Sequence, residues 1–114
     1  MSLDGLVMHV TSTAAQGVVG SDTHLYLSQK GSRILGRYAG GAVVRGRLVG
    51  RVAGSELVFR YAQVEASGEI HGGSSVCEVL RRNDGRTRIL EHFTWRTRLG
   101  AGTNIFDELR TDRA

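Results

Sequence analysis

The chain has 114 residues, of which 15 are basic and 11 acidic, and its formal net charge is +4. A chain of this length forms one domain, and 40% hydrophobic residues supply a core without metal ions or disulfides. We therefore expect a single domain over residues 1–114. The first basic residue is Lys30 and the apolar runs are short, so the sequence predicts neither a signal peptide nor a membrane-spanning segment.

Cys77 is the only cysteine, so it has no partner for a disulfide within the chain, which is typical of a reducing compartment. Together with the missing leader, it indicates a cytoplasmic location. The sequence pI of about 10.0 suggests an anionic partner, although a charge of +4 spread over a whole domain produces only a modest field.

Sixteen glycines and no proline divide the chain into short segments. The longest stretch without glycine runs from Arg86 to Leu99, which leaves little room for a helix, whereas strands fit this spacing. Glycine, asparagine and aspartate between the segments suit the tight turns of hairpins. The sequence predicts eight strands, in chain order: Leu6 to Ser12, Asp22 to Ser28, Ser32 to Ala39, Ala42 to Gly50, Glu56 to Val64, Glu69 to Leu80, Arg86 to Thr97 and Thr103 to Arg110.

Apolar and charged residues alternate in these segments, as expected of strands with one buried face. Ten arginines fall on the outward parity: Arg33, Arg37, Arg45, Arg47, Arg51, Arg60, Arg86, Arg88, Arg96 and Arg98. The inward parity collects large apolar residues: Ile34, Tyr38, Val44, Leu48, Leu57, Phe59, Tyr61, Ile89, Phe93 and Trp95.

Consecutive strands joined by short turns pair antiparallel, so the predicted fold is an all-β, eight-stranded up-and-down meander that closes into a barrel. An open sandwich is the alternative. In the eighth segment, Asn104 is also suited to cap a short helix, although we favour the strand. The glycines inside strands are expected to mark bulges or sharp bends: Gly36, Gly46, Gly50, Gly72 and Gly73.

A set of spaced motifs extends over nearly the whole chain: Tyr38-Ala39-Gly40-Gly41, Gly46-x-Leu48-x-Gly50, Leu57-x-Phe59-x-Tyr61-x-Gln63 and Asp84-Gly85 followed by Leu90-Glu91-x-Phe93-x-Trp95. In order and spacing they resemble a family of short bacterial proteins, the avidin-like, calycin-type small barrels. The resemblance implies an avidin- or lipocalin-like barrel with a ligand cup at one end. Proteins of this fold that bind biotin wall the cup with several tryptophans, whereas this chain has only Trp95.

Members of the resembled family are often labelled N-acetylglutamate synthase, a name that implies acetyl transfer from acetyl-CoA to glutamate. Acetyltransferases of the common fold bind the pyrophosphate where a strand runs into a helix. The most similar string here, from Gln29 to Gly36, has its glycines at other positions. We therefore rank an enzyme last among the functions considered.

The inward parity predicts the residues of the lumen and hence the candidate ligand site: Tyr38, Tyr61, Gln63, Ser75, Glu91, Phe93 and Trp95. Glu91 is a carboxylate between apolar neighbours, so it needs hydrogen-bond donors or a proton. We expect Tyr38, Tyr61 and Gln63 to donate to it. Either Glu91 recognises a ligand amine, amide or hydroxyl, or its network only fixes the strand register, and the lumen is either open or filled.

The remaining residues that carry chemistry predict no further site. No two histidines have the spacing of metal ligands, so we expect no metal and no cofactor. Arg33 to Arg51 form a basic stripe on two strands, but Tyr38, their aromatic residue, points inward, whereas proteins that bind single strands expose aromatics. We therefore favour a solvated face and do not expect nucleic acid or a membrane as partner.

The leading functional hypothesis is a non-enzymatic barrel that binds a small ligand in its lumen. The alternative is a structural or protein-interaction module that self-associates into a homo-oligomer through its outer sheet face.

Overall fold

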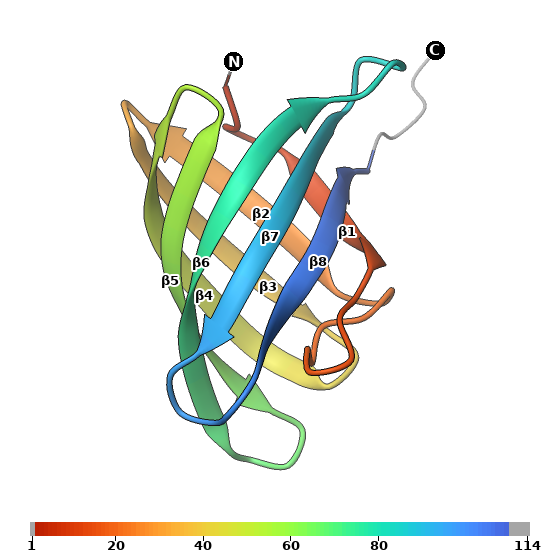
Figure 1. The fold of residues 1–114 in the computed structure, drawn as a ribbon, viewed down its shortest axis with the longest axis vertical. Coiled ribbons are helices and arrows are strands. Elements are labelled where there is room, and N and C mark those ends of the chain that lie inside the picture. The colour runs from red at the N-terminus through yellow and green to blue at the C-terminus, as the bar shows by residue number, and fades with distance from the viewer. Residues whose placement is uncertain (1, 110–114) are drawn as a thin grey trace.

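Eight antiparallel strands joined in chain order close into a barrel in the computed structural model, which describes residues 2–109 (Figure 1). The strands are β1 (Val7–Ser12), β2 (His24–Lys30), β3 (Arg33–Gly40), β4 (Val43–Ala53), β5 (Glu56–Glu65), β6 (Ile70–Arg81), β7 (Thr87–Trp95) and β8 (Ala101–Glu108). Each pairs with the strands before and after it, and β1 pairs with β8. This architecture confirms the predicted meander barrel, and the open sandwich is wrong.

The pairing of β1 with β8 closes the barrel. Val10 pairs with Phe106 across this seam, and β8 also pairs with β7 along its whole length. The main-chain groups of the last segment therefore bond to a strand on either side, as a sheet requires. The strand predicted here is confirmed and the helix capped by Asn104 is wrong, while Arg110 lies outside the described residues.

The interior has an aliphatic half and a polar, aromatic half. Leu3 lies across the aliphatic end with 1% of its surface exposed, and its amide donates to the side-chain oxygen of Gln29 at 2.8 Å. Burial of one such side chain contributes about 1.5–3 kcal/mol, so this half stabilises the barrel. The buried side chains of the aliphatic half include Met8, Ile34, Leu57, Cys77, Val79 and Ile89.

A β-bulge corrects the prediction for the start of β4. The register shifts between Val43 and Arg45, which places one extra residue on this strand. Because side chains alternate, the insertion exchanges the two faces locally. Val43 is therefore buried and Val44, expected inside, is 60% exposed.

The five glycines expected to mark bulges or sharp bends are not themselves the sites of the register shifts. The register shifts lie elsewhere, at Val10/Ser12, Tyr38/Gly40 and Val43/Arg45. A β-carbon on Gly46 would overlap the ring of Tyr38, and one on Gly36 would come within 2.8 Å of the Leu48 side chain. These glycines leave room for large side chains of the neighbouring strand.

Most of the ten arginines lie on the outer surface as predicted, but Arg98 does not. β7 ends at Trp95, two residues earlier than expected, and the chain turns at residues 96–100. The turn breaks the alternation, so Arg98 folds back over the end of the barrel, with its Cζ atom 4.7 Å from the centroid of the Trp95 ring. No helix within residues 2–109 is long and apolar enough to cross a membrane.

Candidate functional site

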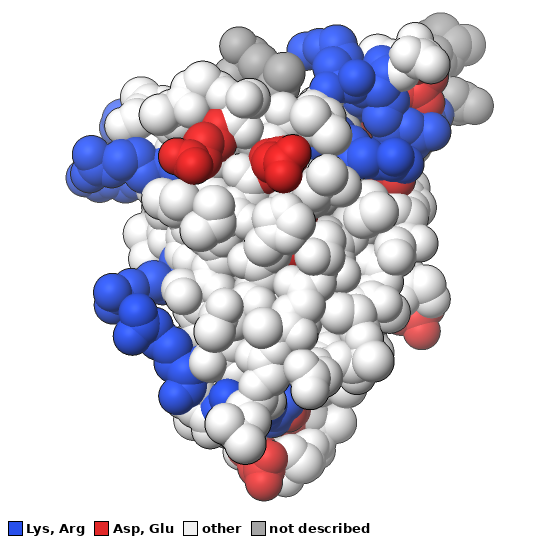
Figure 2. All heavy atoms as spheres, viewed as in Figure 1, with Lys and Arg blue, Asp and Glu red and all other residues white. Residues whose placement is uncertain are grey.

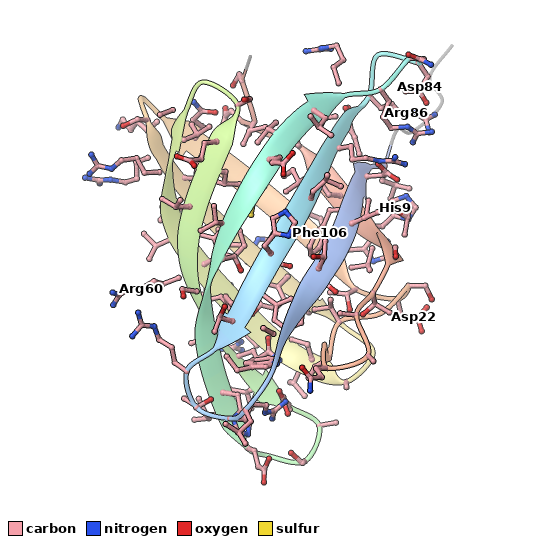
Figure 3. All side chains as sticks on the ribbon, viewed as in Figure 1. His9, Asp22, Arg60, Asp84, Arg86 and Phe106 are labelled. Atoms are coloured by element: carbon pink, nitrogen blue, oxygen red, sulfur yellow. The ribbon has the colours of Figure 1, made fainter. Side chains whose placement is uncertain are left out.

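The polar half of the interior opens toward the end of the barrel where the β1–β2, β3–β4, β5–β6 and β7–β8 connections lie (Figure 1). Three of these connections are short turns. The fourth is the long segment between β1 and β2, residues 13–23, whose side chains pack against the core at Ala14, Val18 and Val19. Figure 3 places Asp22, near the end of this segment, away from the turn that carries Asp84 and Arg86. We call residues 13–23 the covering loop.

A chain of hydrogen bonds runs across this end of the barrel. The Tyr38 hydroxyl donates to Gln63 Oε1 at 2.8 Å, and Gln63 Nε2 donates to Glu65 Oε2 at 2.8 Å. Arg98 completes the chain by donating to Glu65 Oε1 at 2.7 Å. Burial of Glu65 raises its pKa, but the hydrogen bonds from Arg98 and Gln63 outweigh this and hold the pKa below its usual value. Glu65 is therefore an ionised, fully paired carboxylate.

Glu91 belongs to a second network, deeper in the lumen. Ser75 Oγ lies 2.6 Å from Glu91 Oε2, and Asn104 Nδ2 donates to Glu91 Oε1 at 3.0 Å. Burial raises the pKa of Glu91, and the hydrogen bonds from Ser75 and Asn104, which lower it, only partly offset this effect. The expected donors Tyr38, Tyr61 and Gln63 are wrong, because β7 lies between β6 and β8 and takes its partners from those strands.

Tyr61 lies among aromatic rings and makes no hydrogen bond through its hydroxyl within the described residues. The side chain is 9% exposed, and its ring centroid is 5.5 Å from that of Trp95 in an edge-to-face arrangement. Burial raises the pKa of the Tyr61 phenol well above its ordinary value, so the group remains a neutral donor. A buried donor without an acceptor costs about 1–3 kcal/mol.

Hydrogen bonds fasten the covering loop to the barrel, one of them from Thr23 Oγ1 to the Gly40 carbonyl at 3.2 Å. Trp95 Nε1 donates to the Gln16 carbonyl at 2.9 Å, and the Ala101 amide donates to Gln16 Oε1 at 3.1 Å. The Ala14 amide donates to Asn104 Oδ1 at 3.1 Å. Asn104 thus connects the loop to Glu91, because its side-chain nitrogen donates to Glu91 and its side-chain oxygen accepts from the Ala14 amide of the loop.

A cavity of about 30 Å³ remains beneath the covering loop. Such a volume holds about one water molecule, whereas sites for drug-sized molecules measure about 300–1,000 Å³. Side chains therefore fill the lumen in this state. The cavity is lined by Gly17, Val18, Val19, Leu25, Tyr38, Leu48, Phe59, Tyr61, Gln63, Glu91, Phe93, Trp95, Asn104 and Phe106.

All seven residues of the predicted site lie in the lumen, and six of them line this cavity. The seventh, Ser75, does not line the cavity but forms a hydrogen bond with Glu91, which does. Asn104 and Glu65, both of which are buried, were not among the predicted site residues. Their parity was a usable signal: Asn104 shares it with Phe106 on β8, and Glu65 continues the inward row of β5 one residue beyond the predicted end of the strand.

One cluster has the residue types of a metal site. Glu65, Glu69 and His71 place one candidate ligand atom each within 4.8 Å of one another. However, the Arg98 guanidinium lies 2.7 Å from a Glu65 oxygen and 3.9 Å from a Glu69 oxygen. This positive charge pairs with Glu65 and offsets part of the negative charge of the cluster, which is better described as an ion-pair network at the rim.

The architecture and the buried polar end define the class of protein: a small, closed up-and-down β-barrel with a covered lumen. Comparison with protein families matches residues 1–109 to the avidin-like protein family. The chain therefore belongs to the avidin-like protein family. Searches of curated proteins and of solved structures found no match.

Proposed function

We propose that the protein binds a small, uncharged and mainly apolar molecule in its lumen, beneath the covering loop. The observation that carries the proposal is the Tyr61 hydroxyl, a buried donor that has no acceptor among the described residues and belongs to a side chain that lines the cavity. A ligand oxygen or nitrogen would supply that acceptor and recover the free energy that the unpaired hydroxyl costs.

The lining of the cavity supports an uncharged ligand. Aliphatic and aromatic side chains surround a few neutral polar groups, and burial favours the protonated form of Glu91. The ionised groups Glu65 and Arg98 neutralise each other. A charged ligand would lose its hydration without meeting an unpaired opposite charge, which is costly in such a site.

The size of the cavity supports a ligand that replaces part of the covering loop. Val18 and Val19 line the cavity and are only partly buried. Because few hydrogen bonds hold this loop, its outward displacement would enlarge the site at modest cost. Such a ligand would disturb the bond between Trp95 Nε1 and the Gln16 carbonyl, and the indole would report it.

The first test is a thermal-shift screen of neutral metabolites, read by the emission of Trp95, the single tryptophan. A ligand that binds only the folded state raises the unfolding temperature and changes the emission. The matched variants are Tyr61→Phe and Tyr38→Phe. Because the Tyr61 hydroxyl has no partner in the described part of the chain, Tyr61→Phe is expected to weaken binding without loss of stability, whereas Tyr38→Phe loses stability.

Glu91→Gln separates the two interpretations of the deeper network. If Glu91 supports recognition, this isosteric change alters ligand affinity and leaves the fold intact. If Glu91→Gln unfolds the protein, and no neutral compound shifts the unfolding temperature of the native chain, the network is structural and the proposal is wrong.

A second candidate is self-association through the outer face of β5, β6 and β7. Val58 on β5 and Val76 on β6 are register partners, 40% and 52% exposed, and Figure 2 shows a broad area without charged side chains in the middle of the face in view, below two acidic groups. An uncharged patch of this kind favours contact with a second copy. Sedimentation of the native chain and of Val76→Lys at high concentration tests this, because a monomer in both excludes it.

A further inference from the structure

Basic side chains gather on one side of the barrel. Residues 23–55, which contain β2, β3 and β4, hold six basic and no acidic residues, although the net charge of the chain is only +4. Arg60 on β5 extends this side, and Figure 3 shows its side chain projecting away from the barrel. The remaining residues are net acidic, so the electrostatic field of the protein is one-sided. We call Lys30 and the six arginines of β3 to β5 the basic face: Arg33, Arg37, Arg45, Arg47, Arg51 and Arg60.

Within the described part of the chain, the arginines of the basic face have no acidic partner, whereas four arginines elsewhere have one. Arg82, Arg86, Arg88 and Arg98 each contact a carboxylate. Within residues 2–109, no ion pair involves an arginine of the basic face. Their guanidinium groups are therefore available to an anion from outside the chain.

The strand register brings these charges close together. Arg33 is the partner of Arg51, and Arg37 is the partner of Arg47, in the pairing of β3 with β4. Like charges directly opposite one another destabilise a sheet. A bound row of anionic groups would relieve this repulsion, which favours a partner with repeated negative charges over a single small anion.

A groove of about 800 Å³ crosses the basic face. Arg37, Arg47 and Arg60 line it together with the exposed apolar side chains Leu35 and Val49. Leu35 and Val49 are register partners between the two arginine pairs. The groove thus combines guanidinium groups with an apolar floor and contains no carboxylate among its lining residues.

An exposed aromatic residue also lines this groove. Tyr26 on β2 is the register partner of Arg37, is 39% exposed, and has the Arg37 Cζ atom 4.5 Å from its ring centroid. Nucleic acid was not expected from the sequence because Tyr38 points inward; Tyr26, on the adjoining strand, supplies the missing outward ring. Aromatic rings and arginine planes are the surfaces on which unpaired bases stack.

We propose that the basic face binds single-stranded nucleic acid. Arg37, Arg47 and Arg60 contact the phosphates, while a base stacks at the Tyr26 and Arg37 pair. A duplex keeps its bases inside, so it gains the phosphate contacts but not the stacking. A lipid surface would likewise contact only the charged groups and has no bases to stack. The Tyr26 and Arg37 pair therefore favours a single strand over a duplex or a lipid surface.

The test measures the anisotropy of a labelled oligothymidylate with the full chain over a range of salt concentrations. Arg37→Gln/Arg47→Gln is expected to weaken binding at least tenfold and to make the log–log salt slope shallower by about 1.4, or about 0.7 for each lost phosphate contact. Its matched control is Arg81→Gln/Arg96→Gln, which removes the same charge outside the basic face and is expected to leave affinity within about twofold. Thermal unfolding confirms that each variant is folded.

Substitutions of Tyr26 test base stacking separately from charge, because they leave the charge of the basic face unchanged. Tyr26→Ala is expected to weaken binding about tenfold and Tyr26→Phe to preserve it, because the ring carries the stacking. The proposal is wrong if the oligonucleotide does not bind, or if the two double arginine variants behave alike. It is also wrong if a duplex or phosphatidylserine vesicles bind as tightly as the single strand and Tyr26→Ala has no effect.

Discussion

The ring of Tyr38 on β3 lies against Gly46 on β4, in the space that a β-carbon at residue 46 would occupy. The two residues are direct register partners inside the barrel. Tyr61 and Gly73 repeat the arrangement between β5 and β6. A large ring and a missing side chain thus complement each other, which lets a narrow barrel hold several aromatic residues in its interior.

Gly46→Ala is expected to lower the free energy of unfolding by about 2 kcal/mol, because the added methyl group forces the Tyr38 ring out of place. Urea denaturation measures this change. The control is Gly20→Ala, where no atom lies within 4 Å of the new carbon and stability is expected to be unchanged or slightly higher. Equal effects of the two substitutions would show that overlap with Tyr38 is unimportant.

Removal of either interior tyrosine hydroxyl is expected to have a different effect on stability. Tyr38→Phe breaks a 2.8 Å hydrogen bond and leaves Gln63 Oε1 unpaired, so it costs about 1–2 kcal/mol. Tyr61→Phe removes a hydroxyl without a partner in the described structure, so stability stays the same or rises. Urea denaturation midpoints of the two variants measure this difference. A larger loss of stability for Tyr61→Phe than for Tyr38→Phe would contradict the prediction.

Glu91 makes the stability depend on pH in one direction. Its folded-state pKa is raised, above all by burial, from an ordinary value of 4.5. Between 4.5 and the raised pKa, the folded protein keeps a proton that the unfolded chain releases, so stability falls as pH rises through this window. One proton held in this way makes the free energy of unfolding fall by at most about 1.4 kcal/mol for each pH unit.

Glu91→Gln cannot titrate and is expected to abolish this dependence. The unfolding free energies of wild type and variant should converge at low pH and diverge above 4.5, with the variant more stable. Urea denaturation at a series of pH values measures both curves. Curves that run parallel across this range would show that the Glu91 pKa is not raised.

Asp107 is expected to act in the opposite direction. Hydrogen bonds from Arg88, at 2.7 and 3.0 Å, and from Thr11 lower its pKa below an ordinary value of 3.8 despite burial. The stability it provides is present above 3.8 and is lost as pH falls through the lowered pKa. Asp107→Asn is expected to cost about 2 kcal/mol at neutral pH, with the difference shrinking in acid.

The control for Asp107→Asn is Asp84→Asn in an exposed turn. The side-chain oxygen of the new asparagine still accepts the hydrogen bond from the Arg86 backbone N–H. The ion pairs of Asp84 are long and solvated. The expected loss is below about 0.5 kcal/mol. Comparable losses at the two sites, by urea denaturation, would mean that the pairing of the buried Asp107 with Arg88 contributes no more than an exposed ion pair.

The strands and most inward residues could be predicted because alternation is a local property that one buried face imposes on sequence. Prediction failed where the period is interrupted. The bulge at Val43 and Val44 inserts one residue, and the early end of β7 lets Arg98 turn inward. Neither event leaves a signal in the alternation itself, since both depend on pairing with the neighbouring strand.

The polar contacts of the site were harder to predict than its residues. Parity shows that Glu91 points inward, but the choice among inward donors depends on which strands adjoin β7 and at what register. Ser75 and Asn104 satisfy that condition, whereas Tyr38 belongs to a strand farther around the ring. The covering loop could not be predicted as part of the lumen, since irregular segments carry no period.

The pairing of the first and last strands closes the barrel, so no strand lies at an edge and every strand has a neighbour on both sides. The Leu109 amide donates to the Val7 carbonyl at 2.8 Å, so the end of β8 adjoins the start of β1. A linker there, combined with new ends at the exposed turn of Gly54 and Ser55, would keep every pairing while beginning the chain at β5. What the barrel conserves is thus the cyclic order of its strands, and circular permutation is a change it can accommodate.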